Sequence, residues 1–429
     1  MRSFFKIKRA EDILESLKDI EPLGTESVHI TGVLDRILAR DVISGEDLPG
    51  FQRCTVDGYA LAARDTYGAS ESLPALLTVA GEVGMGKIPQ FGLKRGECAL
   101  IPTGGMLPEG ANAVAMVEYS QRIEDGVVEV TRPVSPLENV IQSDDDVKRG
   151  QVILHKGTPV RPQDLGILAG LGIAHVDVFD KPRAAIMSTG EEIVDIGQQT
   201  KPGQIRDINS YTLGGLCIKS GAEPIYLGII RDRFEDLRAL VEKGISQADV
   251  VLLSGGSSVG AKDFTLDAFL SLEGIEIVAH GVSISPGKPT IIARIGNKTL
   301  WGLPGHPVSA MIIFDVFIKF LFGRLSGLSN PTEYDSHAIE AELDRNVESA
   351  SGREDYIRVR LTHMEDRWLA TPILGKSGLI STMVEADGII RIDMNTEGLY
   401  RGEKVKVRLF KNNAKAKDIS ENEGSQRGT

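Results

Sequence analysis

The spacing of apolar and polar residues changes several times along the chain, and each change indicates a different kind of domain. In residues 8–40, acidic and apolar side chains are interleaved at helical spacing, so we expect this segment to be largely helical. From about residue 41 to 145, short apolar runs such as 75–79 and 127–130 are broken by Gly and Pro. This texture predicts a small β-rich domain inserted after a helical start.

The next part of the chain alternates between two kinds of apolar run. Strand-like runs at 184–187, 250–253 and 291–293 are separated by helical runs such as 234–246. That alternation predicts an α/β domain with a largely parallel sheet. Further on, 356–361 and 404–409 alternate with a period of two, which is typical of strands.

The predicted fold is therefore multidomain α/β plus β, with a central α/β domain, an inserted β-rich domain and a C-terminal β domain. A length of 429 residues fits three or four domains. We expect a helical first domain made of 1–45 with 146–175, the inserted domain at 46–145, the α/β domain at 176–330, the C-terminal β domain at 335–410 and a disordered polar tail at 411–429.

Composition limits the classes of function. Hydrophobic residues make up 41% and charged residues 25%, which excludes global disorder. The formal net charge of −12 gives no general attraction to nucleic acid or to an anionic membrane, so we expect neither as a partner. The apolar stretch at 308–322 contains Asp315 and Lys319 and is short for a bilayer, which favours a buried or interface helix over a membrane span.

Cysteine usage and the N-terminus bear on the compartment. Cys54, Cys98 and Cys217 are an odd number without paired spacing, so we expect neither a disulfide framework nor a structural zinc site. The charged N-terminus lacks the apolar run of a signal peptide. Together these features predict a cytoplasmic protein without a tightly held transition metal.

Three glycine-containing loops, each following an apolar run of the α/β region, are candidates for chemistry. They lie at 188–192, 254–260 and 302–307. In open parallel sheets, ligands bind at the carboxyl ends of the strands, and glycine-rich backbone with Ser or Thr hydroxyls can hold an anion. Pro307 is suited to open a helix that continues through Ser309. Each loop alone is more often an ordinary turn, and only the three together indicate a shared anion site.

None of these loops carries a common nucleotide signature. G-x-x-x-x-G-K-[ST] does not occur in the chain, and none of the loops has G-x-G-x-x-G spacing. Neither an ordinary P-loop nucleotidase nor a standard dinucleotide-binding unit is supported.

Carboxylates follow the loops closely. Glu191 and Glu192 end the first loop, Asp263 follows the second, and Asp232 comes just after another apolar run. Several carboxylates beside a phosphate-type loop suit Mg²⁺, which prefers oxygen ligands and often shares them with substrate phosphate. For any one of these residues, a solvated surface acid or a helix N-cap is the more common role.

Three further side chains have both a chemical and an ordinary interpretation. Lys288 stands between two prolines, so a fixed cation for an anionic substrate and a plain surface lysine are about equally supported. His306 is either a base or, more commonly, a loop histidine packed on backbone. Cys54 has too few basic neighbours to indicate a reactive thiol.

A series of motifs resembles one family. Residues 47–60 read D-L-P-G-F-Q-R-C-T-V-D-G-Y-A and resemble the D-x-P-x-F…D-G-Y-A signature of the molybdopterin molybdenumtransferases, which include bacterial MoeA and the E domain of gephyrin. The resemblance covers about residues 8–410, and the ordered series is far more specific than any one piece. Further matches follow in the family's order at 101–105, 188–192, 207–210, 254–263, 286–289 and 302–309.

The resemblance implies a fold and an activity. Members of the family have a helical first domain that resumes after an inserted β domain, then an α/β domain and a C-terminal β domain. They are homodimers, with the active site between the α/β domain of one subunit and the inserted domain of the other. The implied reaction is the last step of molybdenum cofactor assembly, in which molybdate is placed on the dithiolene of adenylylated molybdopterin with Mg²⁺ and AMP is released.

The resemblance also assigns residues by position. The implied catalytic residues are Asp57 and Thr103 from the inserted domain, with Glu192, Asp232, Asp263 and Lys288. The implied metal ligands are Glu192, Asp232 and Asp263. The implied substrate-binding residues are Thr189, Gly190, Ser254, Gly255, Gly256, Ser257, Pro304, Gly305, Pro307, Ser309, Arg353 and Ser377, and Lys288, Ser309, Arg353 and Ser377 are those expected near molybdate.

The sequence departs from the family pattern at four positions. Ser285 stands where many members have a second lysine, Ile141 and Asp144 replace an arginine and a glycine, and His306 replaces a common asparagine. Because one cation is missing from the oxyanion site, a tungstate-specific transferase is an alternative function.

Two other functions remain open from the sequence. One is a catalytically impaired member that acts as a scaffold, and the other is a Mg²⁺-dependent enzyme for another adenylylated or phosphorylated pterin-like ligand. A scaffold would be free to lose Asp57, Asp263 and Lys288, so their retention favours the transferase.

Overall fold

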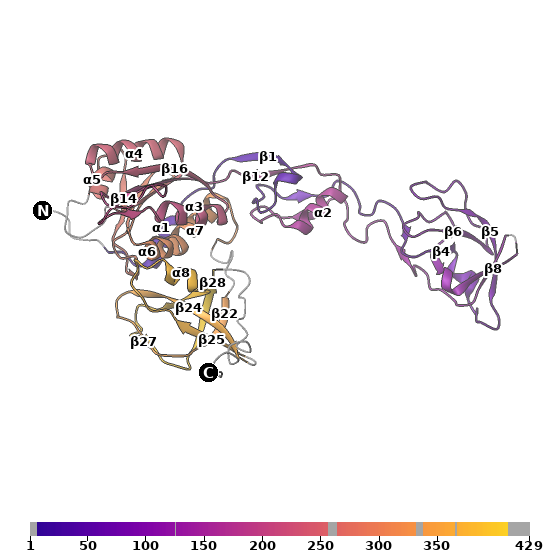
Figure 1. Cartoon of the computed structure of the whole chain (residues 1–429). Coiled ribbons are helices and arrows are strands. Elements are labelled where there is room, and N and C mark those ends of the chain that lie inside the picture. The colour runs from indigo at the N-terminus through magenta and orange to yellow at the C-terminus, as the bar shows by residue number, and fades with distance from the viewer. Residues whose placement is uncertain (1–6, 125, 256–263, 332–337, 365–366, 411–429) are drawn as a thin grey trace.

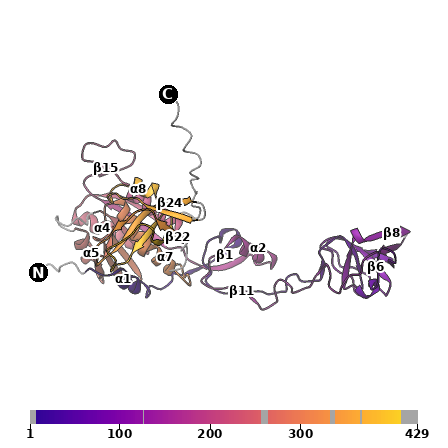
Figure 2. The ribbon, with the colours of Figure 1, turned by 90° about the horizontal axis from the view of Figure 1, so that it is seen from below.

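The computed structural model describes residues 7–124, 126–255, 264–331, 338–364 and 367–410. Its elements form four parts, which we call the body, the C-terminal domain, the middle region and the arm. The body is 183–325 together with α1, the C-terminal domain is 338–410, the middle region is 25–43 with 152–179, and the arm is 53–141. The body and the C-terminal domain lie against each other, whereas the middle region and the arm extend away from them (Figure 1). Figure 2 shows the same separation from below, so the arm lies apart from the body of its own chain.

The body is built on a six-stranded sheet with the order β16-β13-β17-β21-β20-β18. The first four strands are parallel, and β20 and β18 are antiparallel at one edge. The predicted α/β domain with a largely parallel sheet is confirmed. The strands are β13 (Arg183–Thr189), β16 (Glu223–Ile230), β17 (Val250–Ser254), β18 (Glu276–His280), β20 (Ile291–Ile295) and β21 (Lys298–Leu303), with a short parallel pair β14 (Ile193–Val194) and β15 (Ile205–Arg206) beside them.

Both faces of this sheet are covered because successive side chains of a strand point to opposite faces. Ala184 and Ile186 belong to one buried cluster, and Ala185 and Met187 belong to the other. Helices α4 and α5 pack on the second face, and α3, α6 and α7 on the first. They are α3 (Asn209–Lys219), α4 (Phe234–Gln247), α5 (Phe264–Leu270), α6 (Pro307–Ile313) and α7 (Lys319–Leu325), with a π-helical turn at Phe314–Ile318 between the last two.

The apolar stretch at 308–322 forms α6, the π-helical turn and the start of α7, and it is largely buried in the body. Its Asp315 pairs with Arg408 of the C-terminal domain. Among the described residues, no helix is long and apolar enough to cross a membrane.

Helix α1 (Ala10–Leu17) differs from two expectations, the helical segment at 8–40 and the helical first domain. Only this part of residues 8–40 is an α-helix, because the chain then forms β1 (Thr25–His29) and a 3-10 turn. The apolar face of α1 is buried in the cluster that contains β13 and β17 of the body. Helix α1 therefore packs on the body, not in a helical first domain, because the first face of the sheet offers it a large apolar surface to bury.

The middle region consists of two short antiparallel ribbons and one helix. Strand β1 pairs with β12 (His175–Phe179), and β2 (Val42–Ile43) pairs with β11 (Val152–Leu154). Helix α2 (Pro162–Gly170) begins at a proline, and the carboxylate of Asp164 accepts from the N–H of Arg161 before its first turn. The expectation that 1–45 with 146–175 form a helical domain is thus wrong for most of these residues.

The arm is a small β domain, as the broken apolar runs predicted. Its six main strands pair in the order β7-β4-β6-β5-β9-β8, with buried clusters around them. The strands are β4 (Gly58–Leu61), β5 (Ala75–Glu82), β6 (Glu97–Ile101), β7 (Ala113–Met116), β8 (Ser120–Glu124) and β9 (Val127–Val130), joined by a ribbon of β3 (Arg53–Cys54) and β10 (Val140–Ile141) and by 3-10 turns at Ala63–Thr66 and Val117–Tyr119.

The C-terminal domain is a sheet that closes on itself, because β24 pairs with β25 on one side and with β26 on the other. Strand β19 of the body extends it by pairing with the start of β24. The elements are β19 (Ile284–Ser285), β22 (Ala338–Leu343), β23 (Val347–Glu348), β24 (Glu354–Met364), β25 (Arg367–Pro372), α8 (Ser381–Glu385), β26 (Gly388–Ile392), β27 (Gly398–Leu399) and β28 (Lys404–Leu409). The predicted tail at 411–429 lies outside the described residues.

Candidate functional site

Three loops meet at the carboxyl ends of the parallel strands. The N–H of Gly255, after β17, donates to the carbonyl oxygen of Leu303 at the end of β21 over 3.1 Å. Gly255 has a φ of +102°, and a Cβ there would lie 2.1 Å from the carbonyl oxygen of Thr189 at the end of β13. A Cβ on Gly305 would lie 3.7 Å from the Cα of Gly255. The loops are therefore in direct contact, and only glycine fits at position 255.

A buried cluster of hydroxyl groups lies behind these loops, around one carboxylate. The Ser188 hydroxyl donates to Oδ1 of Asp207 at 3.0 Å, and it lies 3.0 Å from Oγ of Ser254 and 3.2 Å from Oγ of Ser210. The N–H of Ser210 donates to the same oxygen of Asp207 at 3.0 Å. The cluster fixes the ends of β13 and β17 against the start of α3, so the loops keep one geometry.

Asn209 extends this connection to the third loop. Its Nδ2 donates to the carbonyl oxygen of Gly305 at 2.9 Å, and its buried Oδ1 has no hydrogen-bond partner among the described residues. The sequence contains Asp207, Asn209 and Ser210 as a family-like motif, but the motif alone assigns them no role. Their contacts show that they position the loops.

Two of the three expected metal carboxylates lie beside the first loop. The hydroxyl of Thr189 donates a short hydrogen bond to Oδ1 of Asp232, which is half-buried after β16. The exposed carboxylate of Glu192 lies over Gly190, where a Cβ would be 2.9 Å from Oε2. Mg²⁺ usually takes one or two protein carboxylates and completes its shell with water and substrate phosphate. This pair therefore suits a Mg²⁺ ion shared with a phosphate group.

Three expected site residues, Gly256 and Ser257 in the second loop and Asp263 just after it, lie outside the described residues. In the part of the chain that the structure describes, no group of three or more His, Cys, Asp or Glu side chains is arranged to hold a metal ion. A Mg²⁺ site completed by substrate does not need such a cage, so the donor set still fits Mg²⁺.

A cavity of about 690 Å³ opens next to the hydroxyl cluster, between β14, β16 and the start of α3. Tyr211 and Tyr226, with ring centroids 6.4 Å apart, line it together with Asp207 and Ser210 of the hydroxyl cluster. Cavities of this size hold small organic ligands. The body therefore has room for such a ligand next to the hydroxyl cluster.

A second group of expected residues gathers where the body meets the C-terminal domain. The hydroxyl of Ser377 lies 2.8 Å from Nδ1 of His306. The carbonyl oxygen of Ser377 accepts from the N–H of Val308 at 3.2 Å, and Ser309 is buried in the first turn of α6. Helix α6 begins at Pro307, as predicted. His306 thus orients Ser377 across the boundary between the two domains.

Lys288 is brought to the same boundary by its loop. Ser285 of β19 pairs with Asp355 at the start of β24, and a Cβ on Gly287 would lie 2.8 Å from Ile313 of α6. The Lys288 side chain is exposed. An exposed ammonium group at this boundary is suited to meet an oxyanion that arrives from solvent.

Arg353 already has an ion-pair partner. Its Nε lies 3.2 Å from the carboxylate of Asp355, which is buried and also accepts from Oγ of Ser349 at 2.6 Å. The structure therefore places Arg353 near the expected region, but with its charge balanced inside the C-terminal domain.

Arg358 is a candidate that the sequence reasoning missed. It is only 6% exposed, and its guanidinium donates to the carbonyl oxygens of Gly375 at 2.9 Å and Ile373 at 3.4 Å. Within the part of the chain that the structure describes, its Nε has no partner, and burial lowers the pKa of Arg358. A buried cation without a carboxylate is costly unless an anion compensates it. Its contacts thus place Arg358 under the loop that carries Ser377, whereas Arg353 is paired with Asp355.

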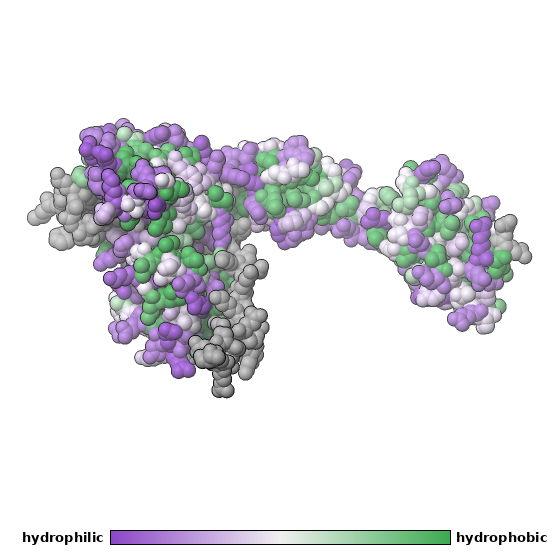
Figure 3. All heavy atoms as spheres, viewed as in Figure 1, coloured by the Kyte–Doolittle hydropathy of each residue, from purple (hydrophilic) through white to green (hydrophobic). Residues whose placement is uncertain are grey.

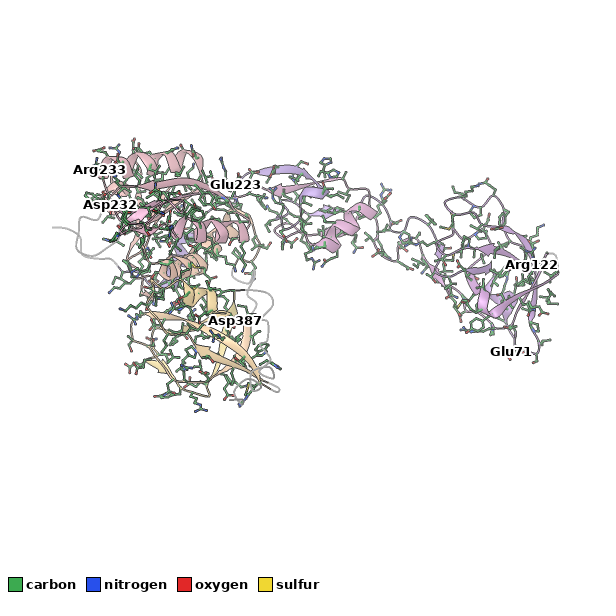
Figure 4. The ribbon with its side chains drawn as sticks, in the orientation of Figure 1. Glu71, Arg122, Glu223, Asp232, Arg233 and Asp387 are labelled. Atoms are coloured by element: carbon green, nitrogen blue, oxygen red, sulfur yellow. The ribbon has the colours of Figure 1, made fainter. Side chains whose placement is uncertain are left out.

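Asp57 and Thr103 form a pair of their own in the arm. The N–H and the hydroxyl of Thr103 donate to Oδ1 of Asp57 at 2.6 and 2.8 Å, and both residues are exposed. These two donors lower the pKa of Asp57. In Figure 4, Glu71 of the arm and Asp232 of the body lie at opposite ends of the molecule. The structure therefore does not bring Asp57 and Thr103 to the loops of their own chain.

Thr103→Val is expected to raise the pKa of Asp57 toward its ordinary value, because it removes one of the two donors. The folded pKa lies below the unfolded one, so ionised Asp57 favours folding above the unfolded pKa, and this contribution is lost as pH falls through the folded pKa. In the variant it is lost at a higher pH. An NMR titration of the Asp57 carboxyl carbon measures the shift, with Thr55→Val as the exposed control. Equal titrations in all three proteins would contradict the pairing.

Comparison with known proteins first identifies the broad class of protein to which the chain belongs. Three family models match successive parts of it. They are described as "MoeA N-terminal region (domain I and II)" at residues 6–172, "Probable molybdopterin binding domain" at 185–323 and "MoeA C-terminal region (domain IV)" at 340–410. The fold and the loops are thus those of a multidomain protein of molybdopterin biosynthesis.

Full-length relatives narrow the class to one family. The molybdopterin molybdenumtransferase of Bacillus subtilis is 32% identical over 391 residues, which is 90% of this chain and 90% of that protein. The one of Haemophilus influenzae is 33% identical over 391 residues, 91% of this chain and 95% of that protein. A crystal structure of the molybdopterin biosynthesis MoeA protein from Pyrococcus horikoshii has a TM-score of 0.81 at 33% identity, and the match covers 94% of this chain and 100% of that one. The chain belongs to the MoeA family of molybdopterin molybdenumtransferases.

Proposed function

We propose that this chain is a molybdopterin molybdenumtransferase that places molybdate on the dithiolene of adenylylated molybdopterin and releases AMP. The observation that carries the proposal is the contact of three glycine loops at the carboxyl ends of β13, β17 and β21. The three loops form a row, with Asp232 beside the first loop at one end and Ser377 beside the third loop at the other. The row offers separate places for a phosphate-linked nucleotide and for an oxyanion.

At the phosphate end, the chain supplies hydroxyl groups, glycine backbone and carboxylates. Glu192 and Asp232, with Asp263, would hold Mg²⁺ together with the substrate phosphates. When bound, Mg²⁺ supplies positive charge that stabilises the AMP oxygen as it leaves. The Thr189 hydroxyl fixes one oxygen of Asp232, which leaves the other oxygen for the ion.

We assign the oxyanion end to hydroxyl groups and cations from two domains. Ser309 and Ser377 would donate to molybdate oxygens, and Lys288 and Arg358 would balance its charge. With Ser285 in place of a second lysine, these two are the cations that the proposal assigns to the oxyanion. The same set would accept tungstate, so the choice of oxyanion is left to experiment.

We further infer that the working unit is a homodimer. Asp57 and Thr103 lie in the arm, apart from the loops of their own chain, so they would reach an α/β site only in a second copy (Figure 1). Figure 3 shows hydrophobic residues on the viewed face of the body and of the middle region. Tyr211 and Ile218 of α3 are 50% and 63% exposed, and such surfaces are typical of protein interfaces.

We assign the reaction to the cytoplasm. The three cysteines are free and buried, which fits a reducing compartment. Burial raises the pKa of Cys98 and of Cys217 to about 12, so these thiols stay protonated and unreactive at neutral pH.

The test is AMP release from adenylylated molybdopterin by the purified full chain with Mg²⁺, with molybdate, with tungstate and with neither. Release that requires one of the oxyanions supports the transferase and identifies the oxyanion. Mixing Asp57→Asn with Asp232→Asn chains tests the dimer, because one intact site per mixed dimer restores activity only if the arm works in the other subunit. A folded dimer that releases no AMP with either oxyanion would favour a scaffold.

A further inference from the structure

The connection between the middle region and the body is a tightly packed joint. Gly327 ends α7 with a φ of +69°, and the N–H of Leu328 donates back to the carbonyl oxygen of Gly323 at 2.9 Å. A Cβ on Gly327 would lie 2.3 Å from Cε2 of Phe179, the last residue of β12. The ring of Phe179 therefore lies directly on the glycine that ends α7.

Backbone contacts hold this joint from the side of the middle region. Ser329 donates from its N–H to the carbonyl oxygen of Gly157 at 2.9 Å and from its hydroxyl to that of Lys156 at 3.2 Å. The Nζ of Lys156 lies 5.7 Å from the centre of the Phe179 ring, and Arg36 donates to the Phe179 carbonyl oxygen at 2.7 Å. Phe179 is thus held by Gly327 and Lys156 at its ring and by Arg36 at its backbone.

A cavity of about 1010 Å³ lies beside the joint, and Phe179, Leu328 and Gly323 are among the residues that line it. The joint is therefore packed on one side and open on the other. A Phe179 ring that is forced off Gly327 has space to move, and the middle region would turn with it. The arm lies beyond the middle region, so a small rotation here displaces Asp57 by a larger distance (Figure 1).

We propose that the joint of Phe179, Gly327 and Ser329 sets the reach of the arm and so positions Asp57 and Thr103 in the site of a second copy. The proposal rests on the proposed function for the identity of that site. Phe179 and Gly327 are positioning residues, since they lie in the joint and not beside the loops. Misplacement of catalytic groups by about 1 Å is enough to reduce turnover by up to about 100-fold.

The test uses Gly327→Ala, in which the new Cβ collides with the Phe179 ring. Gly172→Ala is the matched control, because Gly172 has a nearly equal φ of +66° but no atom within 4 Å of its Cβ position. The double variant Gly327→Ala with Phe179→Leu is the rescue, because leucine lacks Cε2 and Cζ, two of the three ring atoms that collide. All three are made in the full chain, and their melting temperatures are recorded.

Two quantities are measured for each variant. The first is the distance between spin labels at Glu71→Cys in the arm and Glu235→Cys on α4, both exposed positions, with excess unlabelled chain so that only distances within one chain count. The native cysteines are buried and do not compete for the label. The second is kcat for oxyanion-dependent AMP release.

For Gly327→Ala we expect a shifted or broadened distance and a kcat lowered about tenfold, with both restored in the double variant and unchanged in Gly172→Ala. An unchanged distance in Gly327→Ala would overturn the role of the joint. A changed distance with full kcat would overturn the claim that the joint positions Asp57. If the wild-type chain releases no AMP, the proposed function and the destination of the arm fail together, while the distance still reports on the joint.

Discussion

Asp232→Asn is expected to lower kcat for AMP release by about 100-fold or more, the largest loss among the described site residues. Asparagine keeps the size of the side chain and still accepts from the Thr189 hydroxyl, so the loop is retained. What is lost is one negative charge at the place where Glu192 and Asp232 would share Mg²⁺ with the substrate phosphates. The expected loss is therefore electrostatic and not structural.

Titrating Mg²⁺ in the AMP-release assay measures this effect, because a lost metal carboxylate also raises the Mg²⁺ concentration needed for half-maximal rate. Asp236→Asn is the control, since Asp236 is an exposed acid four residues further on, in the first turn of α4. If both variants keep wild-type kcat and Mg²⁺ dependence, Asp232 is a structural partner of Thr189 only.

The fold could be predicted from the sequence where the apolar pattern determines burial on its own. The runs at 184–187 and 250–253 are apolar on both faces, and they became β13 and β17, which are covered by helices on both sides. The expectation for 8–40 was wrong for a related reason. Helical spacing shows that α1 has an apolar face, but it does not show which part of the chain covers that face. In the structure, the body covers it.

The meeting of the three loops could also be predicted, because parallel strands end at one edge of a sheet. The hydroxyl cluster behind them depends on register, which the sequence does not state. Ser188 of β13 and Ser254 of β17 are register partners, and Asp207 reaches them from a segment between β15 and α3. A shift of one residue in this pairing would turn the serines to opposite faces.

Two arginines at the start of β24, one just before the strand and one within it, also show what the sequence alone does not state. Arg353 and Arg358 lie close together in sequence, and a motif match cannot distinguish them by environment. The structure distinguishes them, because Arg353 pairs with Asp355, whereas the partners of buried Arg358 among the described residues are carbonyl oxygens. Burial and charge balance are properties of the packed domain, so they appear only once the sheet has closed.

Arg358→Gln is therefore expected to weaken molybdate binding without lowering the melting temperature. Removal of the buried cation should raise the KM for molybdate about tenfold or more, which corresponds to about 1.4 kcal/mol of lost oxyanion binding. Glutamine retains one donor for the carbonyl oxygen of Gly375, and it no longer requires a charge to be buried without a partner. The melting temperature should consequently stay level or rise.

Steady-state kinetics at varied molybdate concentration measures the KM, and thermal unfolding measures the melting temperature. Arg360→Gln is the control, because Arg360 lies on the same strand but is exposed and paired with Glu385. A fall in melting temperature with unchanged KM would assign Arg358 to support of the 373–377 loop alone. A raised KM at level stability would show that the C-terminal domain supplies a cation to the oxyanion site, and that the charge of Arg358 is kept for binding at no gain in stability.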